Sequence, residues 1–163
     1  MVIDQDGRRV EIMFFGRAHT GADLVVNLPA EKIAITGDLL VYPVPLMGST
    51  SYPLEYAATL ERLKALGSRT YIPGHGPVMK DDSYLDKMIG LANAVRDRSK
   101  AAYKPGETVE QMRGKIDLAD QQKVFAGDSR HRGFIFRNYV TLSATAAAQK
   151  HLAAVSSAGA RGN

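Results

Sequence analysis

The hydrophobic pattern of the chain changes near residue 50, and this change constrains the fold more than any other feature of the sequence. Up to residue 42, short runs rich in β-branched and aromatic residues alternate with turns that contain Gly, Asp or Pro, a pattern typical of β-strands. We predict a hairpin from residues 2–3 and 9–15, followed by two further strands at residues 23–28 and 32–36.

From residue 51 onwards, apolar residues recur at helical spacing. We predict the following elements: a helix at 53–66, a strand at 69–72, a long helix at 82–104, a brief helix capped by Thr108 and Gln111, and a last helix at 134–152. The sequence contains no internal repeat and no composition shift that would mark a second domain. We therefore expect one domain over residues 1–155 and a disordered tail at residues 156–163.

The composition is that of an ordinary globular protein, with 45% apolar and 23% charged residues in a chain of 163. The formal net charge of +4 is small for a nucleic-acid-binding protein. The basic excess lies within residues 96–137, which we interpret as solvated helix surface. No apolar run reaches the length of a membrane span, so we expect neither a nucleic-acid nor a membrane partner.

The chain contains no cysteine, which excludes a disulfide framework, a thiolate nucleophile and a zinc site with Cys ligands. Its first residues lack the basic and apolar regions of a signal peptide. We therefore expect a cytoplasmic location, unless an export signal lies upstream of this sequence.

Three side chains that can bind metal follow predicted strands. His19 lies in the loop after the strand at 9–15, Asp38 follows the strand at 32–36, and His75 stands between two glycines after the strand at 69–72. Loops at strand ends can hold ligands in a fixed geometry, and flanking glycines leave room beside the imidazole. Alone, each residue has a simpler explanation as a hydrogen-bonded surface histidine or a turn. Together they predict a metal site of two imidazoles and a carboxylate.

These residues also carry a resemblance to a known family. The segment Gly-Arg-Ala-His-Thr-Gly-Ala-Asp-Leu-Val-Val-Asn-Leu-Pro at 16–29 resembles the third metal-ligand motif of the metallo-β-lactamase superfamily. Ile-Thr-Gly-Asp-Leu-Leu at 35–40 resembles the fourth motif, and Ile-Pro-Gly-His-Gly-Pro at 72–77 resembles the fifth. The resemblance extends over residues 9–95. It implies that His19 is a ligand of a first zinc, that Asp38 bridges two zincs, and that His75 is a ligand of the second.

The family's signature His-x-His-x-Asp-His is absent from this sequence. The remaining histidines lie far downstream: we interpret His131 as a surface residue among cationic neighbours, and His151 as a residue near a helix end, where the helix dipole favours it. The resemblance therefore implies an α/β fold that is half of a four-layer αββα sandwich, with a mixed sheet and flanking helices. That half is the C-terminal one.

Two functions follow from this resemblance. The first is a portion of a zinc-type hydrolase in which metal-activated water attacks an ester, amide, lactam, thioester or phosphoester of a small molecule, with Asp38 as the catalytic residue. Full-length relatives hold one or two metals, and we expect weak or partial occupancy here. The alternative is a catalytically incompetent half-domain that binds metal weakly or serves association. A mononuclear oxygenase with two histidines and one carboxylate is disfavoured by the order of the motifs.

Two surfaces remain to be assigned. Residues 42–52, which contain Pro, Gly, Ser and Tyr, either line a substrate pocket or form a plain connecting loop. The strands that contain Val25, Ile33 and Ile35 are too apolar to face water, and a half sandwich lacks the sheet that would cover them. We therefore expect a homodimer, or pairing with a separate N-terminal half.

Overall fold

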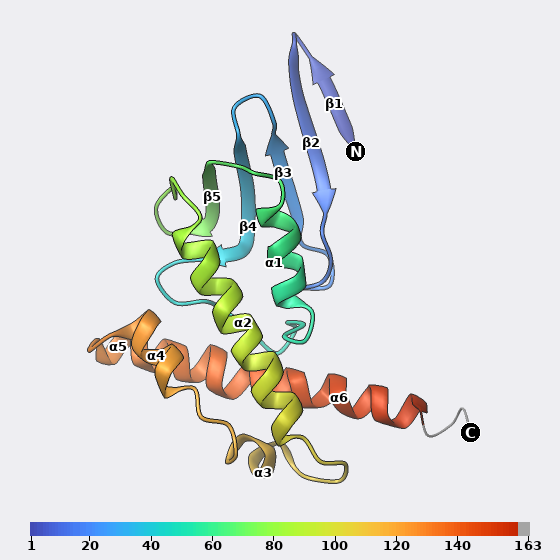
Figure 1. The fold of residues 1–163 in the computed structure, drawn as a ribbon, viewed down its shortest axis with the longest axis vertical. Helices are drawn as coiled ribbons and strands as arrows, with labels where there is room; N and C mark the ends of the chain where they lie inside the picture. Colours follow the sequence, from blue (N-terminus) through green and yellow to red (C-terminus); the bar gives the residue numbers. More distant parts are fainter. Residues whose placement is uncertain (160–163) are drawn as a thin grey trace.

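The computed structural model describes residues 1–159, which form a five-stranded mixed sheet and a set of helices (Figure 1). The strands are β1 (Val2–Gln5), β2 (Arg8–Phe14), β3 (Leu24–Leu28), β4 (Ile33–Val41) and β5 (Thr70–His75), and they lie in the sheet in sequence order. The pairs β1–β2, β2–β3 and β3–β4 are antiparallel, whereas β4 and β5 are parallel. The predicted mixed sheet with flanking helices is thus confirmed.

The predicted hairpin at the N-terminus is present, and its turn explains its register. Asp6 and Gly7 both have positive φ angles, of 52° and 77°. Two consecutive residues with positive φ form a two-residue hairpin turn whose twist matches that of the paired strands. Asp-Gly is a favoured sequence for this turn. Strand β1 consequently pairs with β2 from Val2 opposite Glu11 to Gln5 opposite Arg8.

Helices α1 (Tyr56–Lys64) and α2 (Ser83–Ala102) cover one face of the sheet, as Figure 1 shows. The strand residues that alternate toward these helices are buried, among them Val25, Ala34 and Tyr71. They belong to one apolar core with the inward residues of both helices, which include Leu60, Leu63, Leu85, Met88 and Val95. This part of the core therefore lies between one sheet and one helical layer, which is half of a four-layer sandwich, and the same core continues into the helices after α2.

The opposite face of the sheet carries a row of apolar residues. Ile12 of β2 pairs with Val26 of β3, Val26 pairs with Ile35 of β4, and Ile35 pairs with Ile72 of β5. Directly opposed residues point to the same face of a sheet. Together with the opposed pair Phe14 and Leu24, this row forms what we call the open face. Phe14 is 54% exposed and Leu24 56% exposed.

The chain after α2 is helical throughout most of its length. It contains α3 (Val109–Arg113), α4 (Ala119–Ala126), α5 (Arg130–Phe136), the π-helical segment η1 (Arg137–Ala144) and α6 (Thr145–Gly159). The predicted capping box is present: the backbone amide of Gln111 donates to the hydroxyl of Thr108 at 3.2 Å, and the Gln111 side chain accepts from the Thr108 amide at 2.8 Å.

The predicted bounds of the last helix were too narrow. Helical structure begins at Arg130 and continues to Gly159, so residues 156–159 are helical rather than part of a disordered tail; the rest of that predicted tail, 160–163, lies outside the described residues. Residues 145–159 are rich in alanine, the strongest helix former, which favours this extension. None of the helices in residues 1–159 has both the length and the apolar character needed to cross a bilayer.

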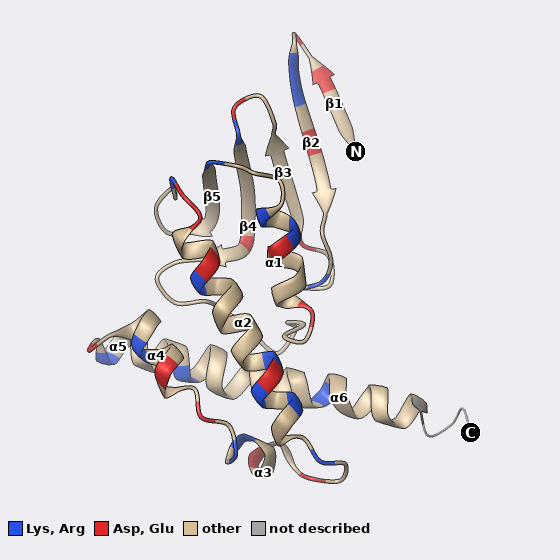
Figure 2. Ribbon diagram, viewed as in Figure 1, with Lys and Arg blue, Asp and Glu red and all other residues tan. Residues whose placement is uncertain are grey.

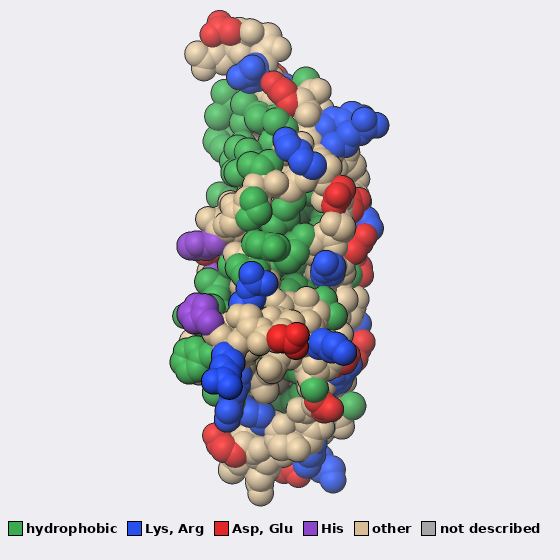
Figure 3. Space-filling model, turned by 90° about the vertical axis from the view of Figure 1, so that its left-hand side faces the viewer, with side chains coloured by type: hydrophobic (Ala, Val, Ile, Leu, Met, Phe, Trp, Pro, Cys, Tyr) green, Lys and Arg blue, Asp and Glu red, His purple; other side chains and the backbone are tan. Residues whose placement is uncertain are grey.

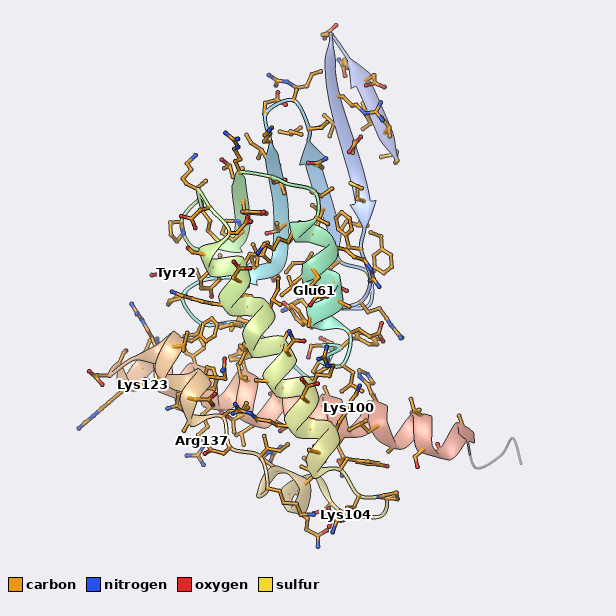
Figure 4. The ribbon with its side chains drawn as sticks, in the orientation of Figure 1. Tyr42, Glu61, Lys100, Lys104, Lys123 and Arg137 are labelled. Carbon is orange, nitrogen blue, oxygen red and sulfur yellow. The ribbon has the colours of Figure 1, made fainter. Side chains whose placement is uncertain are left out.

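Most basic residues within 96–137 are exposed, as expected for solvated helix surface, whereas Arg96, Arg98 and Arg113 are half-buried. Figure 2 shows charged residues on the helices and their connections and also on β1 and β2, while β3 has none. In Figure 4, Lys100 and Lys104 lie at the end of α2, and Lys123 and Arg137 lie on the later helices with their side chains directed outwards. All four are exposed.

Candidate metal centre

His19 is held in a loop between β2 and β3 that is fixed by its own hydrogen bonds. The Asp23 carboxylate accepts hydrogen bonds from the backbone amide of Thr20 at 2.8 Å and from its hydroxyl at 2.7 Å. The loop is also tied to α1, because the Thr59 hydroxyl donates to the carbonyl oxygen of Arg17 at 3.0 Å. These contacts hold the loop backbone on both sides of His19.

Asp38 lies within β4 rather than after it, which corrects the predicted strand end. The register between β4 and β5 shifts on both sides of Gly37, whose φ angle of 52° is in the left-handed region. Such a bulge redirects the side chains that follow it. The buried Tyr56 hydroxyl donates to the carbonyl oxygens of both Asp38 and Leu39, at 3.2 Å each. Burial also raises the pKa of Tyr56 far above its usual range, so the phenol stays protonated and remains a donor.

His75 ends β5, and the glycines beside it make room for neighbouring residues. A Cβ atom at position 74 would overlap the Oδ1 atom of Asp38. A Cβ atom at position 76, where φ is +105°, would lie 2.6 Å from the Cβ of Tyr42. The sequence suggested that these glycines let a ligand approach the imidazole, whereas the structure assigns them to the close approach of Asp38 and Tyr42.

The structure brings all three predicted residues together around the Asp38 carboxylate. The Nε2 atom of His19 lies 3.7 Å from Oδ2, and the Nε2 atom of His75 lies 3.6 Å from Oδ1. These distances are too long for hydrogen bonds. They are close to the separation of about 3.4 Å between two ligand atoms that share a tetrahedral zinc with bonds of about 2.1 Å.

The side chains of His19, Asp38 and His75 do not converge on one position that a metal ion could occupy. Among the described residues, no group of three or more metal-binding side chains is arranged so that it could hold a metal ion. This agrees with the two distances between Nε2 and carboxylate oxygen atoms, because each imidazole faces a different oxygen of Asp38 and the cluster forms two pairs instead of one trio. The buried Nδ1 atom of His19 has no hydrogen-bond partner. Imidazole nitrogens and carboxylate oxygens are both donor types that zinc accepts in proteins.

The two other histidines lie away from this cluster. His131 is exposed on α5, as predicted. His151 was predicted near a helix end but lies within α6, where its ring stacks on Tyr52 with centroids 4.8 Å apart. Both residues line a cavity of about 220 Å³ together with Arg17, Leu54, Glu55, Ala154 and Val155. The lining of this cavity does not include His19, Asp38 or His75. The contact of Tyr52 with α6 could not be predicted from the sequence.

The His151 contact predicts a pH dependence of stability. Burial lowers the pKa of His151, and so do the charges of Arg17 and Lys150, while Glu55 acts in the opposite direction. As the pH falls below about 6.5, the unfolded chain takes up a proton at this imidazole before the folded protein does. The free energy of unfolding is therefore expected to fall as the pH is lowered through about 6.5 and towards the lower pKa of the folded imidazole.

The measurement is urea unfolding of the wild type and of His151→Phe, which keeps an aromatic ring against Tyr52 but cannot be protonated. We expect a shallower decline of stability with falling pH in this variant. His131→Phe, at the exposed histidine, serves as the matched control and should keep the wild-type decline. Equal pH profiles for the wild type and His151→Phe would contradict the prediction.

The fold is a mixed sheet covered by a layer of helices. At the sheet's edge, a carboxylate lies between two imidazoles. These features together define an α/β protein with a candidate metal centre. The family model described as the metallo-beta-lactamase superfamily matches residues 3–75. This range contains all three residues of the cluster. The resemblance found from the motifs at 16–29, 35–40 and 72–77 is therefore confirmed.

A solved structure agrees with this assignment of the fold. A metallo-beta-lactamase from Pontibacter korlensis is 26% identical with a TM-score of 0.52, over 57% of this chain and 45% of that chain. The metallo-beta-lactamase FIM-1 from Pseudomonas aeruginosa, solved in a mono-zinc form, is 20% identical with a TM-score of 0.49, over 58% and 43%. The curated proteins contain no match. The chain thus spans less than half the length of these two solved relatives.

Proposed function

We propose that this chain supplies the His19, Asp38 and His75 part of the centre of a zinc-dependent hydrolase. The observation that carries the proposal is the position of the Asp38 carboxylate, each of whose oxygens faces one imidazole nitrogen at 3.6–3.7 Å. A carboxylate so placed is suited to bridge two metal ions, one beside each histidine. The match of residues 3–75 to the metallo-beta-lactamase superfamily supports the same reading.

The chemistry proposed is attack of water on an ester, amide, lactam, thioester or phosphoester. When bound, zinc in such a centre supplies a water molecule with a pKa near 7 and positive charge that stabilises the developing oxyanion. Asp38 holds the two halves of the cluster at a fixed separation. The buried phenol of Tyr56 fixes the backbone of Asp38 through its hydrogen bond to the carbonyl oxygen.

The same geometry leads us to expect weak metal binding by the chain alone. Each imidazole faces one oxygen of Asp38, so each half of the cluster offers two donors. Structural zinc sites have four protein ligands, and catalytic sites commonly have three. We therefore expect at most one weakly held zinc ion per chain.

Metal analysis after equilibrium dialysis against zinc tests this expectation. Asp38→Asn removes the negative charge at nearly constant shape, and we expect it to weaken zinc binding by about tenfold or more. His131→Ala removes an exposed histidine and is the matched control, with wild-type binding expected. Binding that is unchanged in Asp38→Asn would overturn the proposed site. Two tightly retained zinc ions in the wild type would contradict the expected partial occupancy.

A second function is a metal-binding or association module without catalysis. It is favoured by the two-donor halves of the cluster and by the apolar row on the open face. Hydrolysis assays of the isolated chain with zinc distinguish the two functions. We expect rates near background for generic ester, lactam and phosphodiester substrates, because an incompletely coordinated metal stabilises attacking and leaving groups poorly. Robust turnover that is lost in Asp38→Asn would exclude the second function.

A further inference from the structure

We propose that Tyr52 and His151 are positioning residues for His19: α6 holds the Tyr52 ring, through His151, against the loop that carries this metal-binding histidine. The inference rests on the proposed function, because it concerns one ligand of the same centre, and it adds the C-terminal helix to that site. It follows from contacts on both sides of His19 and from the way in which α6 is anchored.

Tyr52 lies against the loop both before and after His19. Its backbone amide donates a hydrogen bond to the carbonyl oxygen of Ala18 at 2.7 Å. Its ring lies so close to Gly21 that a Cβ atom at position 21 would be 3.4 Å from the Tyr52 hydroxyl oxygen. The guanidinium carbon of Arg17 lies 4.5 Å from the centroid of the same ring. A displacement of the Tyr52 ring would therefore remove support from both arms of the loop.

The orientation of the His19 imidazole depends on this loop. Its buried Nδ1 atom has no hydrogen-bond partner among the described residues, and its Nε2 atom lies 3.7 Å from Oδ2 of Asp38, which is too long for a hydrogen bond. Metal-binding histidines are usually oriented by a hydrogen bond at the second ring nitrogen. Because Nδ1 of His19 lacks this bond, the backbone that carries the residue has to place its imidazole.

The Tyr52 ring is in turn held by α6, which is fixed to the rest of the chain beside His151. The His151 ring stacks on Tyr52 with centroids 4.8 Å apart and an angle of 17° between the ring planes. Ala148, one turn earlier, is fully buried, and the Gln149 side chain donates to the carbonyl oxygen of Glu107 at 2.7 Å. The stack therefore connects a fixed part of α6 to the support of the loop.

The arrangement of the elements agrees with this connection. Strands β2, β4 and β5 all end on the side of the sheet that faces α6 (Figure 1). In the side view of Figure 3, histidine side chains lie about midway along the molecule, below the hydrophobic side chains that gather over the strands. The C-terminal helices thus lie at the end of the sheet that carries the candidate metal centre.

The first test is the mobility of the loop in the zinc-free chain, measured by ¹⁵N relaxation of the backbone amides. His151→Ala removes the ring that stacks on Tyr52, and we expect the order parameters of residues 17–22 to fall from about 0.85 to below about 0.6. Residues 74–76 are held by β5 and should keep their wild-type values. A general loss of stability, followed by urea unfolding, would not single out one loop.

Three further variants complete this test. His151→Phe keeps an aromatic ring against Tyr52 and is expected to keep the wild-type order of the loop. Tyr52→Ala removes the ring that touches the loop and should reproduce the loss seen in His151→Ala. His131→Ala removes the exposed histidine of α5 and is the matched control, with wild-type order expected.

The second test is zinc binding by equilibrium dialysis. We expect the dissociation constant to rise about tenfold in His151→Ala and to stay near the wild-type value in His151→Phe, because groups that orient a ligand histidine typically change metal affinity by about 10- to 100-fold. Loss of loop order and of zinc affinity in His151→Ala, with both restored in His151→Phe, would establish the positioning role.

The failure of this inference is distinct from the failure of the proposed function. Wild-type loop order in His151→Ala would overturn the inference alone. Wild-type zinc binding in His151→Ala, when Asp38→Asn has lost it, would also overturn the inference and leave the site in place. Zinc binding that is unchanged in Asp38→Asn would remove the site itself, and the positioning role with it.

Discussion

Gly74→Ala is expected to abolish zinc binding and to lower the free energy of unfolding by about 1–3 kcal/mol. The new Cβ atom would overlap the Oδ1 atom of Asp38, and it would also lie 2.9 Å from the carbonyl carbon of Gly37 and 3.0 Å from the amide nitrogen of Asp38. The carboxylate can rotate away from this overlap, which removes it from between the two imidazoles. The backbone contacts are relieved only if β4 and β5 move apart.

The measurements are zinc binding by dialysis and unfolding by urea. Gly90→Ala is the matched control, because Gly90 is exposed within α2 and a Cβ atom there would meet nothing within 4 Å. It should keep wild-type zinc binding and raise stability by up to about 1 kcal/mol, since alanine is favoured over glycine inside a helix. Wild-type zinc binding in Gly74→Ala would show that the Asp38 carboxylate is not held by the space at position 74.

The meeting of His19, Asp38 and His75 could be predicted because their positions depend on local signals. Each residue follows or ends a strand that its own sequence marks, and the motifs place those strands side by side. The bulge at Gly37, which puts Asp38 inside β4, could not be predicted, because it depends on the register with β5. The overlap that keeps residue 74 a glycine likewise involves a neighbouring strand.

The fold shows the same division between local and distant causes. The N-terminal hairpin, closed by Asp6 and Gly7, and the Thr108 capping box each depend on a few neighbouring residues, and both were predicted. The stacking of His151 on Tyr52 joins segments that are far apart in sequence, so periodicity carried no information about it. The π-helical segment η1 interrupts the regular spacing of the last helices, where the Ser143 hydroxyl donates to the carbonyl oxygen of Asn138 at 2.7 Å.

The C-terminal helices are joined to the sheet by a chain of aromatic rings. Tyr42, which follows β4, lies 5.3 Å from Tyr84 of α2, and Tyr84 lies 6.0 Å from Phe125 of α4, measured between ring centroids. Phe125 in turn lies 6.3 Å from Phe136 at the end of α5. Apart from Tyr42, these residues belong to the same core as the strands and α1. We therefore predict that residues 1–155 unfold as one cooperative unit.

Phe136→Ala tests this prediction, with an expected loss of about 3–5 kcal/mol in the free energy of unfolding, because truncating a buried phenylalanine removes apolar burial and leaves a cavity. Phe136 is fully buried, whereas Phe134, two residues earlier on the same helix, is 67% exposed. Phe134→Ala is the matched control and should change stability by less than about 0.5 kcal/mol.

Unfolding is followed by circular dichroism and by tyrosine fluorescence. Coincident transitions displaced together in Phe136→Ala are expected, since the aromatic chain couples the helices to the sheet. A variant in which helical signal is lost in a separate early transition, with the sheet still folded, would show that the C-terminal helices form an independent unit.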